Sequence, residues 1–361
     1  MPANPTLDAP EATSLTPRRA VIEMAPYHPP TGARRNKLRL DFNENTVGAP
    51  PHVIDFIKRY LTAADLSIYP EYENALEDLA RHFGARIDEM TLTNGTDEAI
   101  HLLVNTFVER DDEILVLRPS YAMYKFYSQL AGARVQELDY IAGTLEFPLE
   151  ELLERITPAT RAILISNPNN PTGTGLGAGA IEKILKKAAR AAVLIDEAYY
   201  EFSGVTMLPR LGEHPNLFVS RTFSKIYGLA AMRCGCLFSQ AVNMAHVRKA
   251  QSPYSVNALA AMAARIAVQD QKFVEDYVLE VLTARELLYV GLEKLRIPYI
   301  ESQANFVLMQ AGDRAIPIRD ALRERGVLVR DRSYELPGCL RVTIGTRDQI
   351  RHFLDELEQL W

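Results

Sequence analysis

The sequence has little cysteine, a single tryptophan and no long apolar run. Its three cysteines, Cys234, Cys236 and Cys339, are too few and odd in number for a disulfide framework. A Cys-x-Cys pair without other clustered ligands is weak support for a metal site, so we expect no bound metal. The absence of about 18 or more consecutive apolar residues excludes a transmembrane helix. This composition is typical of the reducing cytoplasm, where we expect the chain to act.

An excess of positive charge is missing as well. The 40 Lys and Arg residues are outnumbered by 46 Asp and Glu residues, which gives a net charge of −6. No overall basic field exists to hold nucleic acid or an anionic membrane, so we expect neither as a partner. Any anionic ligand must be bound by local arginines. The N-terminus has four prolines and an Arg-Arg pair but lacks the apolar core of a signal peptide.

Short apolar runs alternate with segments of helical periodicity between about residues 51 and 254. Continuously apolar runs are typical of strands covered on both faces, and strand–helix alternation predicts a mainly parallel sheet with helices on both faces. Apolar residues at helical spacing predict a helix over Asn74–Phe83. The predicted strands are Ile114–Leu117, Ala162–Ser166, Val193–Asp196 and Leu217–Ser220.

The pattern changes after about residue 255. A long helical region, Ala258–Leu295, is followed by predicted strands near Asn305–Met309, Val327–Arg330 and Leu340–Ile344, and then by a closing helix. The chain is therefore predicted to be an α/β protein with a second, smaller α/β domain. We expect a mobile N-terminal tail and arm over residues 1–36, a large domain over 37–254 and a small C-terminal domain over 255–361.

Lys225 lies in the most informative segment, Ser220–Arg233. Hydroxyls at Thr222 and Ser224 and the guanidinium of Arg233 suit a phosphate monoester, and a lysine beside them can form a Schiff base with an aldehyde. A phosphate and an aldehyde on one small molecule describe pyridoxal phosphate (PLP). Taken alone, the segment is equally compatible with a surface lysine.

The segment Thr93–Glu98 opens a predicted helix. Thr96 or Asp97 is expected to cap it, and free backbone N–H groups there would attract a phosphate. Gly95 allows close approach of a ligand to the backbone. A simple capped helix is the alternative interpretation.

Two further segments follow apolar strands. The turn Asn167–Gly173, with two prolines and three asparagines, presents the amide of Asn170 from a rigid platform at the carboxyl end of a strand, where open α/β sheets bind ligands. Asp196 ends the next apolar strand and can hold a cation such as a protonated pyridine ring. Tyr199, three residues on, can donate to a ring hydroxyl. A plain turn and a structural cap are the alternatives.

These four segments, in this order, resemble the fold-type I PLP-dependent aminotransferases, over the chain from about residue 20 to the C-terminus. The resemblance implies three catalytic residues: Lys225, which binds the cofactor aldehyde; Asp196, at the pyridine nitrogen; and Tyr199, which with Asn170 contacts the ring oxygen. Tyr69 resembles the tyrosine that reaches the neighbouring subunit's cofactor, which implies a homodimer with shared active sites. The other cofactor-binding residues so implied are Gly95, Thr96, Thr222, Ser224 and Arg233 around the phosphate, Tyr121 on the ring face, and Asp97.

Within that family the chain looks most like the histidinol-phosphate aminotransferases, which exchange an amino group between histidinol phosphate and 2-oxoglutarate in histidine biosynthesis. The segments that carry this likeness are Met24–Tyr27, Gly32–Arg35, Leu40–Asn45, Leu328–Asp331 and Gly338–Thr346. The likeness implies that Tyr27, Arg330 and Arg341 grip the substrate phosphate or the carboxylate of glutamate, and that Asn43 and Asn305 lie in the site. Guanidinium forks suit both anions.

Several alternatives stay open. Relatives with the same arginine pair act on phenylalanine or tyrosine, and Tyr334 between the two arginines is expected to narrow the pocket. A decarboxylase acting on a phosphorylated amino acid is a more distant possibility. A PLP-binding regulatory domain would need a DNA-binding module, and the residues before the first site segment lack helical periodicity and strong basicity. Arg330 has an alternative interpretation as the partner of Asp331 or Glu335.

Overall fold

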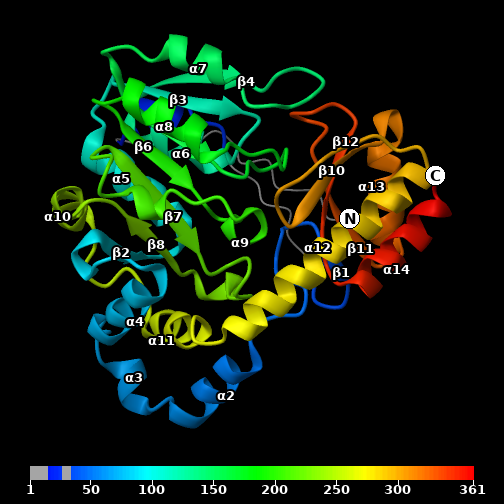
Figure 1. Cartoon of the computed structure of the whole chain (residues 1–361), viewed down its shortest axis with the longest axis horizontal. Helices are drawn as coiled ribbons and strands as arrows, with labels where there is room; N and C mark the ends of the chain where they lie inside the picture. The colour runs from blue at the N-terminus through cyan, green and yellow to red at the C-terminus, as the bar shows by residue number, and fades with distance from the viewer. Residues whose placement is uncertain (1–14, 27–33) are drawn as a thin grey trace.

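The computed structural model describes residues 15–26 and 34–361, which form two sheets with helices around them (Figure 1). In the larger sheet β8 runs antiparallel to its two neighbours, and the remaining pairs are parallel. Its seven strands are, in spatial order, β2 (Met90–Thr93), β8 (Gly235–Phe238), β7 (Leu217–Thr222), β6 (Ala192–Asp196), β5 (Thr160–Ser166), β3 (Glu113–Arg118) and β4 (Arg134–Asp139).

The larger sheet is buried on both faces, because successive residues of its strands enter different apolar cores. In β5, Ala162 and Leu164 belong to one core, whereas Ile163 and Ile165 belong to the other. One face is covered by α5 (Gly95–Phe107), α6 (Ala122–Ala131) and α10 (Ala241–Ala250), and the other by α4 (Glu73–Phe83), α8 (Ala178–Lys187) and α11 (Ala258–Ala267). The predicted sheet with helices on both faces is confirmed.

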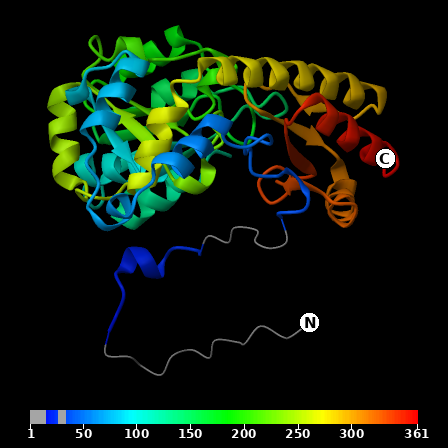
Figure 2. The ribbon, with the colours of Figure 1, turned by 90° about the horizontal axis from the view of Figure 1, so that it is seen from below.

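The smaller sheet contains β1 (Leu38–Leu40), β11 (Val327–Asp331), β12 (Cys339–Thr343), β10 (Phe306–Gln310) and β9 (Tyr299–Ile300), in that order. Only the pair of β1 with β11 is parallel. Helices α12 (Gln271–Lys294), α13 (Ala315–Glu324) and α14 (Arg347–Glu358) pack around it. Figure 2 shows α12 running from the helices of the larger sheet to α14, so it connects the two parts.

The remaining helices are α1 (Arg19–Ile22), α2 (Pro51–Tyr60), α3 (Ala63–Ser67), α7 (Leu149–Arg155) and α9 (Tyr200–Ser203). Helix α1 contacts α6, and Arg18 donates to the carbonyl of Leu130 at 2.7 Å. Within the described part of the chain, no helix combines the length and apolarity that crossing a membrane requires.

Some expectations from the sequence differ from the structure. The region Ala258–Leu295 is two helices, because Asp270 interrupts it and caps α12 by accepting the N–H of Phe273 at 3.0 Å. Strands β1, β2, β4, β8 and β9 were not predicted: β4 is an edge strand with exposed polar positions, and the other four are short.

Strand β1 joins the smaller sheet, with Leu38 opposite Val327 and Leu40 opposite Val329. The sequence-based boundaries had grouped these residues with the large domain. The division into 1–36, 37–254 and 255–361 stays a prediction.

A buried ion pair joins β7 to the residue that follows β6. Arg221 contacts Glu197 at 2.7 Å, and both side chains are almost fully buried. Glu197 also accepts from the Thr206 hydroxyl at 2.7 Å and from the Met207 N–H at 2.6 Å. Burial raises the pKa of Glu197, whereas Arg221 opposes that shift. The Glu197 carboxylate therefore depends on the nearby Arg221 charge to stay ionised in its buried position.

We expect Arg221→Met to lower the free energy of unfolding by about 3–5 kcal/mol at neutral pH, because it leaves the Glu197 carboxylate buried without a cation. The deficit should shrink at lower pH, where Glu197 becomes protonated. Urea unfolding at two pH values measures both effects. The control is Arg351→Met, whose ion pair with Asp348 is exposed and should contribute less than about 1 kcal/mol. Equal losses in the two variants would contradict the role of the buried pair.

Candidate active site

Polar side chains converge where strands of the larger sheet end. Asp196 is the last residue of β6, and Thr222 is the last residue of β7. The segments after β2, β3 and β5 carry Gly95, Tyr121 and Asn170. The carboxyl ends of parallel strands are where open α/β sheets bind ligands.

Asp196 is buried and its carboxylate has neutral partners. Its two oxygens accept hydrogen bonds from the Tyr124 and Ser220 hydroxyls, each at 2.9 Å. Burial raises the pKa of Asp196 to about 6, although these hydrogen bonds favour the charged form. A cation placed against this carboxylate would therefore be strongly favoured.

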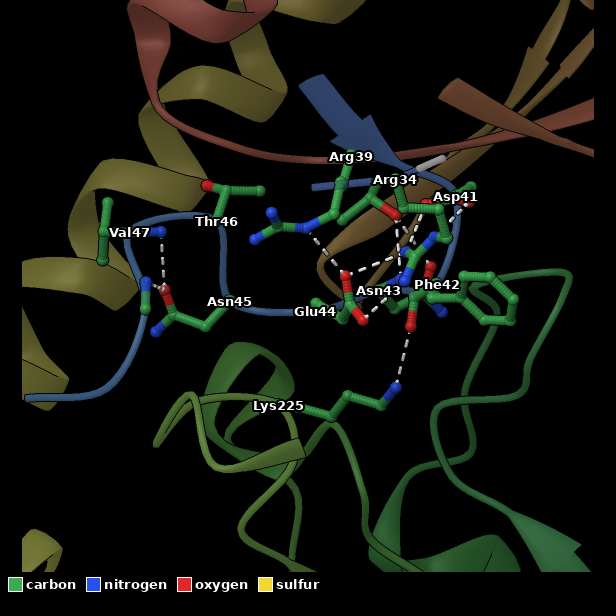
Figure 3. Close-up of polar contacts among 12 residues, drawn as sticks. Arg34, Arg39, Asp41, Phe42, Asn43, Glu44, Asn45, Thr46, Val47 and Lys225 are labelled. Carbon is green, nitrogen blue, oxygen red and sulfur yellow. Dashed lines mark hydrogen bonds and ion pairs between the residues drawn. The ribbon is translucent and has the colours of Figure 1, made fainter. Parts of the chain in front are cut away.

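Lys225 follows β7 and is half-buried. Its Nζ donates to the carbonyl of Phe42 at 3.0 Å and lies 5.8 Å from the centre of the Tyr199 ring (Figure 3). Burial lowers the pKa of Lys225 to about 8, and the charge of Arg341 acts in the same direction. About a tenth of the amine is consequently uncharged at pH 7, which suits a nucleophile or a base.

A cradle of side chains lies at the N-terminus of α5. Arg233 contacts Asp97 at 3.3 Å and donates to the Ser224 hydroxyl at 3.4 Å. Asp97 also accepts from the Tyr121 hydroxyl at 2.6 Å. Gly95 has φ of +73°, and a Cβ there would lie 2.5 Å from the Arg233 guanidinium. A side chain here would be strained by this backbone conformation and would have to displace the end of Arg233.

The predicted cap of α5 by Thr96 or Asp97 is wrong. The cap position is Asn94, whose side chain makes no capping hydrogen bond, and Asp97 instead binds Tyr121 and Arg233. The first turn thus has N–H groups without a side-chain cap, which suits an anion. Thr96 is half-buried in this turn, and the Thr222 hydroxyl accepts the N–H of Ser224 at 3.1 Å.

Tyr199 contacts the N-terminal part of the chain. Its hydroxyl accepts from the Asn43 amide at 3.0 Å, and its ring packs edge-on against Phe306 at 5.1 Å. Asn43 has φ of +56° and is held by Thr343, which accepts its N–H at 3.0 Å. Asn305 donates to the carbonyl of Asn43 at 3.2 Å. Asn43 therefore lies against Tyr199, and Asn305 holds Asn43 in place.

Arg330 and Arg341 are register partners on β11 and β12. Arg341 is only 4% exposed; it donates to the Asn170 side chain, and at 2.7 Å to the carbonyl of Asp41. Its Nε is buried and has no partner. Burial lowers the pKa of Arg341 to about 10, and Arg332 and Arg330 add to the shift.

The alternative ion pairs of Arg330 do not form. Asp331 contacts Arg319 at 3.4 Å, and Glu335 contacts Arg332. Among residues 15–26 and 34–361, Arg330 has no acidic partner, and its guanidinium lies 5.4 Å from the centre of the Phe42 ring. Its charge is therefore available to a ligand.

Residues without an assigned role in the sequence also belong to this region. Tyr124 binds Asp196, and Phe42 offers its carbonyl to Lys225. Arg332 is 8% exposed and has a buried Nε without a partner. Arg332 directly follows β11, and its spacing of two residues from Arg330 was the available signal, because alternate residues of an extended segment share a face.

One predicted residue, Tyr69, lies elsewhere. Tyr69 is 73% exposed and stacks on Tyr254, with ring centres 4.5 Å apart. Its contact with a neighbouring subunit stays a prediction. Tyr27 lies outside the described residues. The described ranges contain no group of three or more His, Cys, Asp or Glu side chains placed to hold a metal ion.

The chain is similar to known proteins over most of its length. The chain is 34% identical to the histidinol-phosphate aminotransferase of Symbiobacterium thermophilum, over 94% of this chain and 97% of that protein. It is also 34% identical to the histidinol-phosphate aminotransferase of Caldanaerobacter subterraneus subsp. tengcongensis, over 94% and 95% of the two chains.

Solved structures share the fold. A putative histidinol-phosphate aminotransferase from Erwinia carotovora atroseptica superposes with a TM-score of 0.83 at 24% identity, over 91% of this chain and 96% of that one. The enzyme from Sinorhizobium meliloti, solved in complex with pyridoxal 5′-phosphate, has a TM-score of 0.80 at 23% identity, over 90% of each chain. The type I fold of PLP-dependent transferases expected from the sequence is thus confirmed. The family profile of aminotransferase class I and II matches residues 35–357, and the chain belongs to that family.

Proposed function

We propose that this chain is a PLP-dependent aminotransferase that transfers an amino group from histidinol phosphate to 2-oxoglutarate. The family uses amino and keto substrates, and the relatives above carry the name of this activity. The observation that carries the proposal is the pair Arg330 and Arg341, which lie opposite each other; Arg341 contacts Asn170, and Arg330 has no acidic partner within the described part of the chain. Two guanidinium groups suit a phosphate monoester.

The residues present fit pyridoxal phosphate. The buried Asp196 carboxylate, with neutral partners, suits a protonated pyridine nitrogen, and the half-buried Lys225 amine suits the aldehyde. The uncapped first turn of α5 and the glycine beside Arg233 suit the phosphate. We propose Tyr121 for the ring face, Tyr199 and Asn170 for the ring oxygen, and Gly95, Thr96, Thr222, Ser224 and Arg233 for the phosphate site, with Asp97 as a further cofactor-binding residue.

When bound, the cofactor would supply an electron sink for the charge left by the substrate's α-proton. Asp196 would keep the pyridine nitrogen protonated by its charge. Lys225, once free, would take the α-proton at Nζ, because its lowered pKa makes the uncharged amine accessible near neutral pH. Arg330 and Arg341 would orient the substrate by its phosphate, and would hold glutamate by a carboxylate.

We also propose a homodimer with shared active sites in the cytoplasm, in which Tyr69 contacts the cofactor phosphate of the other subunit and Tyr27 contacts the substrate. The support is an exposed apolar surface that includes Leu66, Ile68, Tyr69 and Tyr254, since contiguous exposed apolar patches mark interaction sites.

An aromatic amino acid transaminase is the second candidate. Tyr334 is 64% exposed and lies between the two arginines in sequence, with its ring 5.2 Å from the Arg332 guanidinium. Such a ring offers an apolar face to phenylalanine or tyrosine, and the arginines would then serve a carboxylate.

Lys225→Ala should abolish turnover and the near-visible absorbance of the protein loaded with PLP, because no amine remains to bind the aldehyde. Absorbance spectra and steady-state assays check this. Lys187→Ala, which removes an exposed lysine, should leave both unchanged. Retained turnover in Lys225→Ala would refute the assignment.

Asp196→Asn should change how stability depends on pH in the cofactor-free protein. The pKa of Asp196 is raised from 3.8 to about 6, so the folded protein binds its proton more tightly than the unfolded chain. This stabilising contribution is present below pH 4 and is lost as pH rises through 6. Wild type should lose about 3 kcal/mol relative to Asp196→Asn across that window, as measured by urea unfolding. Parallel pH profiles would contradict the burial effect.

The substrate is tested by half-reactions of the PLP-loaded protein with histidinol phosphate, phenylalanine and glutamate, followed by absorbance. Conversion should be fastest with histidinol phosphate. Arg330→Gln should weaken its apparent binding about 10- to 100-fold, as expected for loss of a charge-assisted contact of about 1.5–3 kcal/mol. Faster conversion with phenylalanine would favour the aromatic transaminase instead.

A further inference from the structure

The segment Asp41–Asn45 lies between the two sheets at the site. It follows β1 and is itself part of no helix or strand. Side chains from both parts of the molecule hold it by its carbonyl groups. Three successive carbonyls accept hydrogen bonds: that of Asp41 from Arg341 at 2.7 Å, that of Phe42 from Lys225 at 3.0 Å and that of Asn43 from Asn305 at 3.2 Å.

Arg34 holds the same segment from the side opposite Lys225 (Figure 3). Its guanidinium binds both carboxylate oxygens of Asp41, at 2.7 and 3.1 Å, and both of Glu44, at 3.0 and 3.2 Å. It also lies 4.3 Å from the centre of the Phe42 ring. Arg34 therefore holds Asp41 and Glu44, the two ends of the stretch 41–44. The Phe42 carbonyl within this stretch contacts Lys225.

The ion pairs of Arg34 with Asp41 and Glu44 are partly shielded from water. The Asp41 side chain is 9% exposed, and those of Arg34 and Glu44 are about one quarter exposed. Burial alone would raise the pKa of Glu44, but hydrogen bonding to Arg34 helps to lower it. Arg34 and Glu44 therefore both stay ionised near neutral pH. Bidentate contacts of this kind fix geometry as well as charge.

We propose that Arg34 is a positioning residue for catalysis: by clasping Asp41 and Glu44 it holds the Phe42 carbonyl where it orients the free Lys225 amine. An uncharged amine has two N–H groups and one lone pair. The Phe42 carbonyl uses one N–H and directs the lone pair elsewhere, toward the proton to be removed. The role in catalysis rests on the proposed function, whereas the effect on the amine does not.

The charged groups around Lys225 come from several elements. Arg341 on β12 and Arg233 after β7 lower its pKa, whereas Glu44 and Asp97 raise it. Removing Arg34 changes this balance of charges. A change in the pKa of Lys225 must therefore be distinguished from a change in the position of its amine. Measurement of the amine well above its pKa achieves this, since all of it is then uncharged.

The experiment compares wild type with Arg34→Ala, Arg34→Lys and Arg35→Ala. Arg35 is the exposed neighbour and serves as the matched control. The cofactor-free proteins are treated with trace acetic anhydride across pH 6 to 11, and acetylation of Lys225 is measured by peptide mass spectrometry relative to the exposed Lys187.

In Arg34→Ala the plateau rate of Lys225 acetylation at high pH should fall about 3- to 10-fold, because the amine loses the N–H···O bond that orients its lone pair and makes its nitrogen more nucleophilic. Arg34→Lys should lie between, because an ammonium cannot form both bidentate contacts. Arg35→Ala should stay within about 2-fold of wild type. An unchanged plateau rate in Arg34→Ala would overturn the proposal, even if the melting temperature of that variant falls.

A second measurement uses the PLP-loaded enzymes. Arg34→Ala should lower kcat about 10-fold or more through misplacement of the amine, with a larger isotope effect for substrate deuterated at the α-carbon, and Arg34→Lys should restore part of the rate. Equal kcat values and isotope effects in Arg34→Ala and Arg35→Ala would overturn the catalytic role. If wild type itself fails to turn over any of the three substrates, the proposed function fails, and the acetylation result still decides whether Arg34 holds Lys225.

Discussion

The arrangement of the site depends on the buried guanidinium of Arg341. It lies on β12 of the smaller sheet, yet it binds Asn170 after β5 and the carbonyl of Asp41. One side chain thus joins both sheets and the segment between them, and its charge helps to lower the pKa of Lys225. An anionic substrate group at its free Nε would cancel part of that charge. Lys225 would then be a stronger base with substrate in place than without it.

The larger sheet could be predicted because its central strands are apolar on both faces, as Ile163 and Leu164 illustrate by entering different cores. A continuous apolar run marks such a strand, and the first polar residues after it mark the functional edge. Asp196 and Lys225 could be found in this way. Local sequence carries this information, since strand and following turn are adjacent in the chain.

Contacts between distant parts of the chain could not be predicted. The N–H of Asn43 binds Thr343, 300 residues away, and the hydroxyl of Tyr124 binds Asp196, 72 residues away. No periodicity records such pairs. The cap of α5 was misassigned for the same reason, because Asp97 is drawn to Tyr121 and Arg233 instead of to its own helix.

The pairing of β1 with β11 has a mechanical consequence. Leu40 belongs to the smaller sheet, and Phe42, only two residues on, contacts Lys225 at the edge of the larger one. Two residues span at most about 7 Å, so little chain separates the two contacts. A shift of the smaller sheet relative to the larger one would therefore act on the Phe42 carbonyl. Closure of the protein around a substrate and alignment of its lysine would be a single movement.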